Sequence, residues 1–410
     1  MPGPGFYWIG DEEEKELVDL IRTRYLFRYG NEKDPAFKHR VVSLEEAVSS
    51  AFAVKHALAV SSGTAALITA LSAAGIGPGD EVIVPGYTFI ASISSIIMCN
   101  AVPVLAEIDE SLTLDPDDVE RRITPHTKAI LAVHMLGNAC NLDRLQKIAT
   151  KHGLVLIEDA AQAFGGSYNG RRLGTIGLMG IYSFNIFKTI NAGDGGMVVT
   201  DSEDLFTKSF SYHDQGHLPN RMGVEVGNRS VIGQNFRMTE LSAAVLMAQF
   251  RKLDRILERL RSLKSRFKER IRGIDGLEFR KLNDPAGDCG TILTVLLPDK
   301  KRADLVATRV GSATVAHSGW HVYNNMEHIL GMKTINPKNN PLLNQHYKGN
   351  VEYHKGMLPR TDALLERAIN LSVGVVDSGL GAGFGINADS SDTDVDRQAD
   401  TFKTALRELL

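Results

Sequence analysis

Short apolar runs alternate with helical patterns through the first half of this chain, and this alternation restricts its possible folds more than any other feature. The runs lie at 57–60, 81–85, 102–107, 129–134, 154–158, 180–184 and 197–200. Helical patterns separate most of them, at 64–74, 88–99, 117–123, 142–152 and 203–212. Apolar runs without polar alternation are typical of strands buried on both faces. The order strand–helix–strand therefore predicts an α/β fold with a mostly parallel sheet covered by helices.

A long helical pattern at 239–271 predicts a connector between two lobes, because 410 residues are too many for one compact core. Beyond the connector we expect strands at 277–280 and 291–297, and helices at 301–310 and 394–409. We therefore predict an N-terminal arm and helix (1–42), a large α/β domain (43–255) and a smaller C-terminal α/β domain (256–410). Ser43 and Glu46 have the spacing of a capping box, which predicts that a helix starts there.

Composition and charge exclude several classes of function. A net charge of −3 gives no sign of nucleic-acid or anionic-membrane binding, and no apolar run is long enough to span a bilayer. The three cysteines, Cys99, Cys140 and Cys289, lack metal-ligand spacing and indicate a reducing compartment. His213 and His217 are four positions apart, but no ligand set completes a metal site around them. Since the N-terminus has no signal-peptide pattern, we expect a cytoplasmic protein without a bound metal.

Small and hydroxyl-bearing residues follow the first predicted strand and lead directly into a helix. The stretch 61–67 reads S-S-G-T-A-A-L. A helix start offers unpaired N–H groups and the positive end of the helix dipole, and Gly63 allows a close approach of the backbone. With the Thr64 hydroxyl, these groups can bind a phosphate. An ordinary Ser/Thr helix cap is the alternative interpretation.

Two further strand ends carry side chains suited to a flat, cationic ring. Phe89 stands where the next helix begins and can stack on a heteroaromatic ring, although a core aromatic would look the same. Asp159 ends a buried strand, where a carboxylate is costly without a positive partner. A protonated pyridine nitrogen is such a partner, and Gln162 can then reach the ring hydroxyl. A helix-capping aspartate is the alternative.

Lys188 lies in the apolar stretch S-F-N-I-F-K-T-I, followed by a glycine-rich turn, and Ser183 ends the strand before it. A lysine in apolar surroundings loses charge stabilisation, so its amine can form a Schiff base with a carbonyl cofactor. A half-exposed lysine at a strand end is the alternative. A phosphate site, an aromatic residue that can stack on a ring, a carboxylate for a pyridinium nitrogen and a reactive lysine thus occur in this order, each after a predicted strand. Together they predict a pyridoxal-phosphate (PLP) enzyme.

The motifs resemble those of the DegT/DnrJ/EryC1/StrS sugar aminotransferases, which have the fold-type I aspartate aminotransferase fold. The matching segments are S-G-T-A-A-L (62–67), T-F-I-A-S (88–92), E-D-A-A-Q-A-F-G (158–165), S-F-x-x-x-K (183–188), G-D-G-G (193–196) and G-Q-N-F-R-M (233–238). F-R-Y-G (27–30) and G-W-H-V-Y-N-N-M-E-H (319–328) look like the branch that aminates C8 of an eight-carbon sugar acid, the 8-amino-3,8-dideoxy-octulosonate aminotransferases.

The resemblance implies a role for each matching residue. Lys188 would hold the cofactor, Asp159 would pair with the ring nitrogen, Gln162 with the ring oxygen, and Phe89 would stack on the ring. Gly63, Thr64 and Ser183 would bind the phosphate. Asn235 would reach the phosphate of the neighbouring subunit's cofactor, so a homodimer with shared sites is expected.

Histidines and aromatic residues are frequent in the C-terminal half, where they can either line an acceptor pocket or pack the smaller lobe. The candidates for binding an acceptor are His317, Trp320, His321 and Tyr323. The glycine-rich run at 375–387 is interpreted as a flexible loop.

The function expected from these features is a PLP-dependent aminotransferase. It would move an amino group from an amino acid, for which L-glutamate is the expected donor, to a keto sugar, keto sugar acid or related polyol. One alternative is a dehydratase or lyase of the same family, against which Lys188 argues, because relatives that dehydrate deoxysugars typically carry histidine at that position. A non-catalytic regulator with the same fold is the other, and the intact Lys188, Asp159 and Gln162 argue against it.

Overall fold

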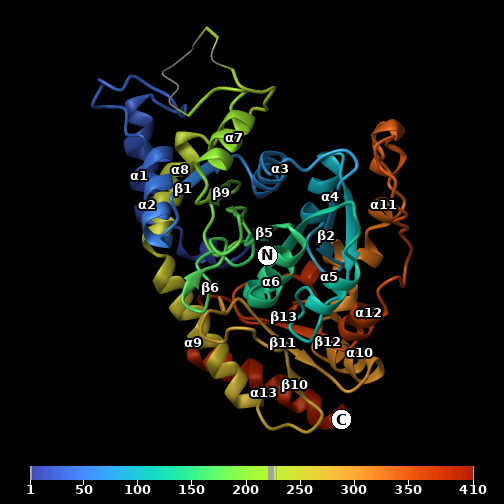
Figure 1. Cartoon of the computed structure of the whole chain (residues 1–410). Coiled ribbons are helices and arrows are strands. Elements are labelled where there is room, and N and C mark those ends of the chain that lie inside the picture. The colour runs from blue at the N-terminus through green and yellow to red at the C-terminus, as the bar shows by residue number, and fades with distance from the viewer. Residues whose placement is uncertain (1, 220–225, 228, 410) are drawn as a thin grey trace.

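A seven-stranded sheet forms the centre of the computed structural model, which describes residues 2–219, 226–227 and 229–409 (Figure 1). In spatial order its strands are β1 (His56–Val60), β9 (Gly196–Thr200), β8 (Met179–Ser183), β5 (Val155–Asp159), β4 (Thr127–Val133), β2 (Glu81–Pro85) and β3 (Val102–Ala106). Only β9 runs antiparallel to its neighbours within this sheet. The mostly parallel sheet predicted from the apolar runs is confirmed.

Helices cover both faces of this sheet, and successive residues of each strand point into two different hydrophobic cores. In β2, Val82 and Val84 pack in one core and Ile83 in the other. The first core contains α3 (Gly63–Ala73), α4 (Ile90–Met98) and α7 (Glu203–His213). The second contains α2 (Arg40–Phe52), α5 (Pro116–Arg121), α6 (Leu142–His152) and α8 (Glu240–Arg251). This double covering explains why the strands read as continuous apolar runs.

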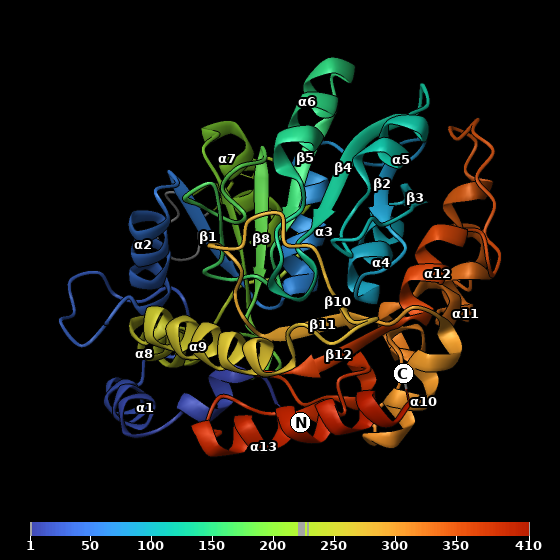
Figure 2. The ribbon, with the colours of Figure 1, turned by 90° about the horizontal axis from the view of Figure 1, so that it is seen from below.

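A second, smaller sheet follows in the C-terminal part of the chain (Figure 2). Its strands lie in the order β10 (Glu278–Phe279), β11 (Ile292–Leu296), β12 (Ala368–Ser372) and β13 (Phe384–Gly385). The helices associated with it are α9 (Leu253–Ile271), α10 (Lys300–Arg309), α12 (Pro359–Glu366) and α13 (Asp392–Leu409). The predicted connector at 239–271 is two helices, α8 and α9, that meet at Lys252, whose ammonium binds Glu13 and the Trp8 carbonyl. The domain boundaries after residues 42 and 255 stay predictions.

Short and irregular elements escaped the sequence analysis. They include the hairpin β6 (Ser167–Tyr168) and β7 (Arg171–Arg172), helix α11 (Glu327–Leu330), and the 3₁₀ helices η1 (Pro4–Trp8), η2 (Met135–Gly137), η3 (Val315–His317), η4 (Gly319–His321), η5 (Tyr323–Asn325), η6 (Pro337–Asn339), η7 (Pro341–Leu343) and η8 (Ser378–Leu380). Strand β12 was missed because Asn370 and Ser372 interrupt its apolar pattern, although both are buried. Within the described ranges, no helix combines the length and the apolar character needed to cross a bilayer.

The start of helix α2 differs from the predicted capping box. Helix α1 (Asp11–Thr23) is followed by an irregular stretch, and α2 begins at Arg40, so Ser43 lies inside the helix and does not cap it. The first N–H groups of α2 are bound instead by the carboxylate of Glu240, which accepts from Arg40 N at 2.6 Å and from Val41 N at 3.0 Å. This cap comes from 200 residues along the chain, so no local pattern could reveal it.

Replacing Glu240 should therefore destabilise the fold more than replacing Ser43. We expect Glu240→Ala to lower the free energy of unfolding by about 2 kcal/mol, because it leaves two helix N–H groups without their acceptor. Ser43→Ala should change it by less than about 0.5 kcal/mol, as an ordinary helix position does. Urea unfolding of the two variants measures both values. A larger loss of unfolding free energy for Ser43→Ala would contradict the assignment of Glu240 as the cap and would favour Ser43.

Candidate active site

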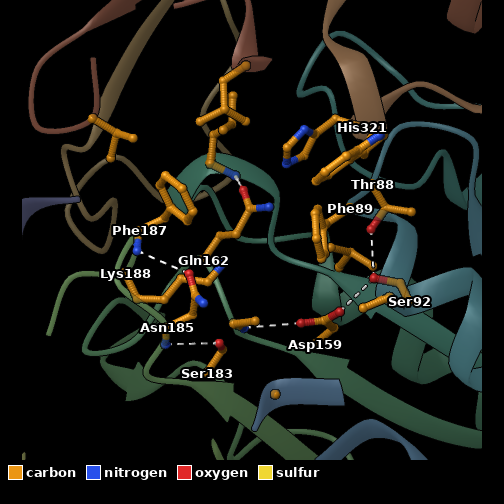
Figure 3. Close-up of a pocket in the computed structure, with 18 of the residues that line it drawn as sticks. Thr88, Phe89, Ser92, Asp159, Gln162, Ser183, Asn185, Phe187, Lys188 and His321 are labelled. Carbon is orange, nitrogen blue, oxygen red and sulfur yellow. Dashed lines mark hydrogen bonds between the residues drawn. The ribbon is translucent and has the colours of Figure 1, made fainter. Parts of the chain in front are cut away.

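A cavity of about 580 Å³ lies at the carboxyl ends of the parallel strands, between the large sheet and the C-terminal part of the chain. The predicted site residues that line it are Gly63, Thr64, Phe89, Asp159, Gln162, Ser183, Lys188, Trp320 and His321. Figure 3 shows Lys188, Gln162 and Phe89 around the same space as the Asp159 carboxylate. Parallel strands bring their ends to one edge of the sheet, which is why residues far apart in sequence meet here.

The start of helix α3 and the end of strand β8 together form a tight, polar corner of the cavity. Ser62 caps α3 by accepting from Ala65 N at 3.0 Å. A Cβ on Gly63 would lie 2.7 Å from the Cβ of Ser183, so no larger residue fits between helix and strand. The N–H groups at the start of α3 and the Ser183 hydroxyl face one small space, which suits a phosphate group.

Strand β5 ends in two buried carboxylates whose surroundings differ. Glu158 accepts four hydrogen bonds from the chain itself, donated by His134 Nε2 and by the backbone N–H groups of Gly174, Ile176 and Gly177. Burial by itself would raise the pKa of Glu158, but the bonds from His134 and the loop lower it overall. Glu158 is thus a satisfied structural anion.

Asp159 is only partly satisfied by the chain. Its carboxylate accepts from Ser92 Oγ at 2.7 Å and from Ala161 N at 3.1 Å, and it is 4% exposed. Burial raises the pKa of Asp159, and these two bonds with the charge of Lys188 offset that effect only in part. A cationic group in the cavity would supply the missing stabilisation of the carboxylate.

The side chain of Gln162 is oriented by a strained backbone. Its Oε1 accepts from Leu136 N at 3.0 Å, and Leu136 has a φ of 54°, which is uncommon for a residue other than glycine. With the oxygen bound in this way, the amide N–H groups of Gln162 can donate to a ligand oxygen in the cavity. Backbone strain of this kind persists where the surrounding structure holds a functional geometry.

Lys188 follows strand β8 in a turn, and its amine points into the cavity beside Phe89. The distance from Nζ to the centre of the Phe89 ring is 6.0 Å. Burial lowers the pKa of Lys188 to about 8, although the negative charge of Asp159 opposes this effect. A substantial fraction of the amine is therefore neutral near pH 8, which nucleophilic attack on an aldehyde requires.

These groups fit pyridoxal phosphate in kind and in arrangement. Asp159 offers a buried anion to a pyridinium nitrogen, Gln162 a donor to the ring oxygen, and Lys188 an amine of lowered pKa. The corner between Gly63 and Ser183 offers N–H and hydroxyl donors to a phosphate. The described residues contain no group of three or more His, Cys, Asp or Glu side chains placed to hold a metal ion.

Three predicted site residues lie elsewhere. Asn235 is exposed, and its backbone pairs with Asp214. His317 is also exposed and bonds Thr314 Oγ1 at 3.0 Å. Tyr323 is fully buried in the packing of the C-terminal part, where its hydroxyl lies 3.0 Å from an Asp362 carboxylate oxygen. None of the three lines the cavity of its own chain.

The glycine-rich run at 375–387 forms one wall of the cavity. It contains the short elements η8 and β13, and its flexibility stays a prediction. Side chains from three places bind consecutive carbonyls of this wall. Ser318 Oγ donates to Gly379 O at 3.0 Å, Asn370 Nδ2 to Leu380 O at 2.9 Å and Ser312 Oγ to Gly381 O at 3.2 Å. Gly381 has a φ of 63°, so the run needs glycine for its turn.

The glycine-rich run and the segment facing it present a carboxylate and an exposed indole to the cavity. Asp377 lines it from the glycine-rich run, and Trp320, which is 66% exposed, lines it from the facing segment. His321 beside Trp320 has its pKa lowered to about 3, by burial and by the charge of Lys188, so its ring is neutral. A carboxylate and a flat ring in one cavity are suited to a polyhydroxylated ligand.

Several residues in and around the cavity carry no role in the sequence-based prediction. Ser92 binds Asp159, Leu136 N binds Gln162, and Asp377 lines the cavity. Ser92 lay inside a quoted motif, so its position after a strand was a usable signal. Leu136 and Asp377 gave no such signal, since their importance depends on backbone conformation and on packing between distant segments.

The fold and this site define a PLP-dependent enzyme of fold type I. Residues 12–376 match the DegT/DnrJ/EryC1/StrS aminotransferase family, and the chain belongs to that family. The predictions of the family, of an aminotransferase and of PLP as its cofactor are confirmed. Other solved structures of this fold are described as PLP and PMP forms.

Comparison with known proteins shows similar sequences over part of the chain and a similar fold over nearly all of it. The chain is 43% identical to GDP-perosamine synthase of Vibrio cholerae, over 64% of this chain and 68% of that protein. It is 44% identical to L-glutamine:2-deoxy-scyllo-inosose aminotransferase of Streptomyces kanamyceticus, over 49% of each. The crystal structure of 3-amino-5-hydroxybenzoic acid synthase superimposes with a TM-score of 0.79 at 26% identity, covering 98% and 97% of the two chains.

The lowered pKa of Lys188 predicts how its amine reacts in the protein without cofactor. A reagent that methylates neutral amines should modify Lys188 with a midpoint near pH 8, more than two units below an ordinary lysine at about 10.4. Reactivity should increase with pH, because the neutral form dominates above the pKa. Peptide mass spectrometry after pulses at different pH measures the midpoint.

Asp159→Asn gives the sign test of the same prediction. Since the charge of Asp159 raises the pKa of Lys188, its removal should move the labelling midpoint to lower pH. A midpoint that moves upward would contradict the electrostatic link between the two side chains.

Proposed function

We propose that this chain transfers an amino group from an amino acid, L-glutamate, to the ketone of a sugar, sugar acid or related polyol. The observation that carries the proposal is one cavity that joins the Lys188 amine, the Asp159 carboxylate and the wall of Asp377 and Trp320. The names of the relatives, a perosamine synthase and an inosose aminotransferase, support an acceptor with several hydroxyl groups.

Within the cavity the chain's own residues would divide the work. PLP supplies the electron sink when it is bound. Asp159 would hold the ring nitrogen protonated, Gln162 would donate to the ring oxygen, and Phe89 would stack on the ring. Lys188 would hold the cofactor and, once displaced, would carry a proton between the substrate carbon and the cofactor.

The phosphate of the cofactor would be bound from one chain and completed from a second. Gly63, Thr64 and Ser183 would bind it within the chain, and Asn235 of each subunit would reach the site of its partner. Apolar side chains near Asn235 support a homodimer, since Val231 is 47% and Ile232 94% exposed. We also propose a cytoplasmic location, which the three buried cysteines without a disulfide support.

A half-reaction with an amino donor tests the proposed function directly. Purified holoenzyme mixed with L-glutamate should lose the absorbance of its bound PLP and release 2-oxoglutarate, with L-glutamine run in parallel as the competing donor. Lys188→Ala should abolish turnover, because among the residues that the structure describes no other lysine lines the cavity. Its melting temperature should change little. Absence of a half-reaction with every amino acid would favour a binding protein, and native turnover by Lys188→Ala would reject the nucleophile.

The same Lys188→Ala chain tests the shared site. Co-expressed with Asn235→Ala, it should recover up to about a quarter of the wild-type sites, since half the dimers are mixed and each has one intact site. Each variant alone serves as the control. No recovery above the controls would contradict a site built from two subunits.

Asp377→Asn should separate the acceptor from the donor. Asparagine keeps the oxygen that accepts from Gly379 N at 2.8 Å, so the turn is retained and only the charge is lost. We expect the KM for the keto acceptor to rise about tenfold, as the loss of one charged hydrogen bond does, with the glutamate half-reaction unchanged. Ser378→Ala, an exposed neighbour that does not line the cavity, is the matched control. An unchanged acceptor KM would remove Asp377 from the acceptor site.

A further inference from the structure

The N-terminal residues of the chain pair with the turn that carries Lys188. Gly3 N donates to Ile186 O at 2.9 Å, and Gly5 N donates to Lys188 O at 3.3 Å. The two bonds lie on either side of Phe187 and Lys188, so they fix the backbone from which the reactive amine projects. No residue of this N-terminal segment lines the cavity, and no sequence motif indicated a role for it.

The contact between the two segments leaves no space for a side chain on Gly3. A Cβ there would lie 2.1 Å from the Phe187 carbonyl oxygen and 2.8 Å from Lys188 N. A Cβ on Gly5 would lie 2.8 Å from Cα of Ile190, two residues after the lysine. Both clashes involve backbone, which cannot rotate away as a flexible side chain does. Glycine at position 3 is therefore required by the position of the lysine turn.

The segment is itself anchored on both sides. On one side, Lys252 Nζ donates to Trp8 O at 2.8 Å and binds the buried Glu13 carboxylate at 2.8 Å. On the other side, Pro4 packs against Gly374, where an added Cβ would lie 2.8 Å from its Cγ. Gly374 directly precedes Val375, which lines the cavity. The segment thus lies between the turn that carries Lys188 and the start of the glycine-rich run at 375–387, which lines the side of the cavity proposed for the acceptor and is called the acceptor wall below.

We propose that residues 3–5 are a positioning element for the catalytic lysine, which holds the Lys188 backbone in place through Gly3 and Gly5. This inference rests on the proposed function, because it assigns the residues an effect on both halves of the transamination. A group that must approach a reacting carbon within normal contact distance loses about a hundredfold in rate when displaced by about 1 Å.

The test compares Gly3→Ala with Gly10→Ala in the full-length holoenzyme. Gly10 lies in the same N-terminal region, and a Cβ there meets nothing within 4 Å. We expect Gly3→Ala to slow the donor and acceptor half-reactions by a similar factor, about tenfold or more, with substrate dissociation constants unchanged. Its Lys188 labelling midpoint without cofactor should also shift, while Gly10→Ala should match the wild type in every measurement.

Two outcomes would overturn the proposal. One is a Gly3→Ala enzyme of native melting temperature whose half-reactions and labelling midpoint are those of the wild type. The other arises if Gly3→Ala does not fold. Pro4→Ala, which keeps both hydrogen bonds but loosens the segment, then decides, and native rates in that variant reject the positioning role. Failure of the wild type to react with any amino donor would instead reject the proposed function, so the two failures are distinguishable.

Discussion

A buried carboxylate that its own chain leaves incompletely satisfied is the interaction on which the rest of the site depends. Asp159 and Glu158 are neighbours at the end of one strand, and both are removed from water. Glu158 receives four hydrogen bonds and is stable as an anion, whereas Asp159 receives two and has its pKa raised by burial. An enzyme that must keep a pyridine ring cationic needs this imbalance, because a fully satisfied carboxylate would have little to gain from the ring. A cationic ring beside Asp159 would offset the unfavourable burial of its carboxylate, and that gain would contribute to the affinity for the ring.

Burial in the same cavity lowers the pKa of the Lys188 amine, whereas it raises the pKa of the Asp159 carboxyl. Burial makes the charged form of Lys188 less stable and the charged form of Asp159 less stable too, so each moves toward neutrality. The residual attraction between their charges opposes both shifts and couples the two groups. A cationic ring beside Asp159 would neutralise much of the charge of that carboxylate. The pKa of Lys188 would then be lowered further, because the charge of Asp159 raises it. Binding of the ring and reactivity of the amine would therefore be linked through one shared anion.

Much of the large sheet and of the cofactor side of the cavity could be predicted from sequence, because both follow from local rules. Continuous apolar runs mark doubly covered strands, and residues at or just beyond the end of such a run lie at the ligand edge. Asp159, Ser183 and Lys188 were predicted at such ends, and all three line one cavity. The acceptor wall could not be predicted in the same way. Its shape depends on carbonyls held by Ser312, Ser318 and Asn370 from distant elements. The bonds to the glycine-rich run come from distant segments and leave no local pattern, just as the cap of helix α2 comes from Glu240 and not from Ser43.

The cofactor side of the cavity was easier to predict from sequence than the side proposed for the acceptor, because the two sides are built from different kinds of structure. The cofactor is one fixed molecule, and the groups that bind it lie on strand ends whose spacing is set by the sheet. The side of the cavity that we propose for the acceptor is built instead by 3₁₀ turns and the glycine-rich run, where sequence can vary more freely than in the central strands. The lysine turn belongs to both parts, since it projects from a strand of the sheet but is braced by Gly3 and Gly5 from the far N-terminus. That brace abuts Gly374 at the start of the acceptor wall. Residues 3–5 thus contact both the lysine turn and the segment that leads into the glycine-rich run, so we expect a change at one of them to affect the other.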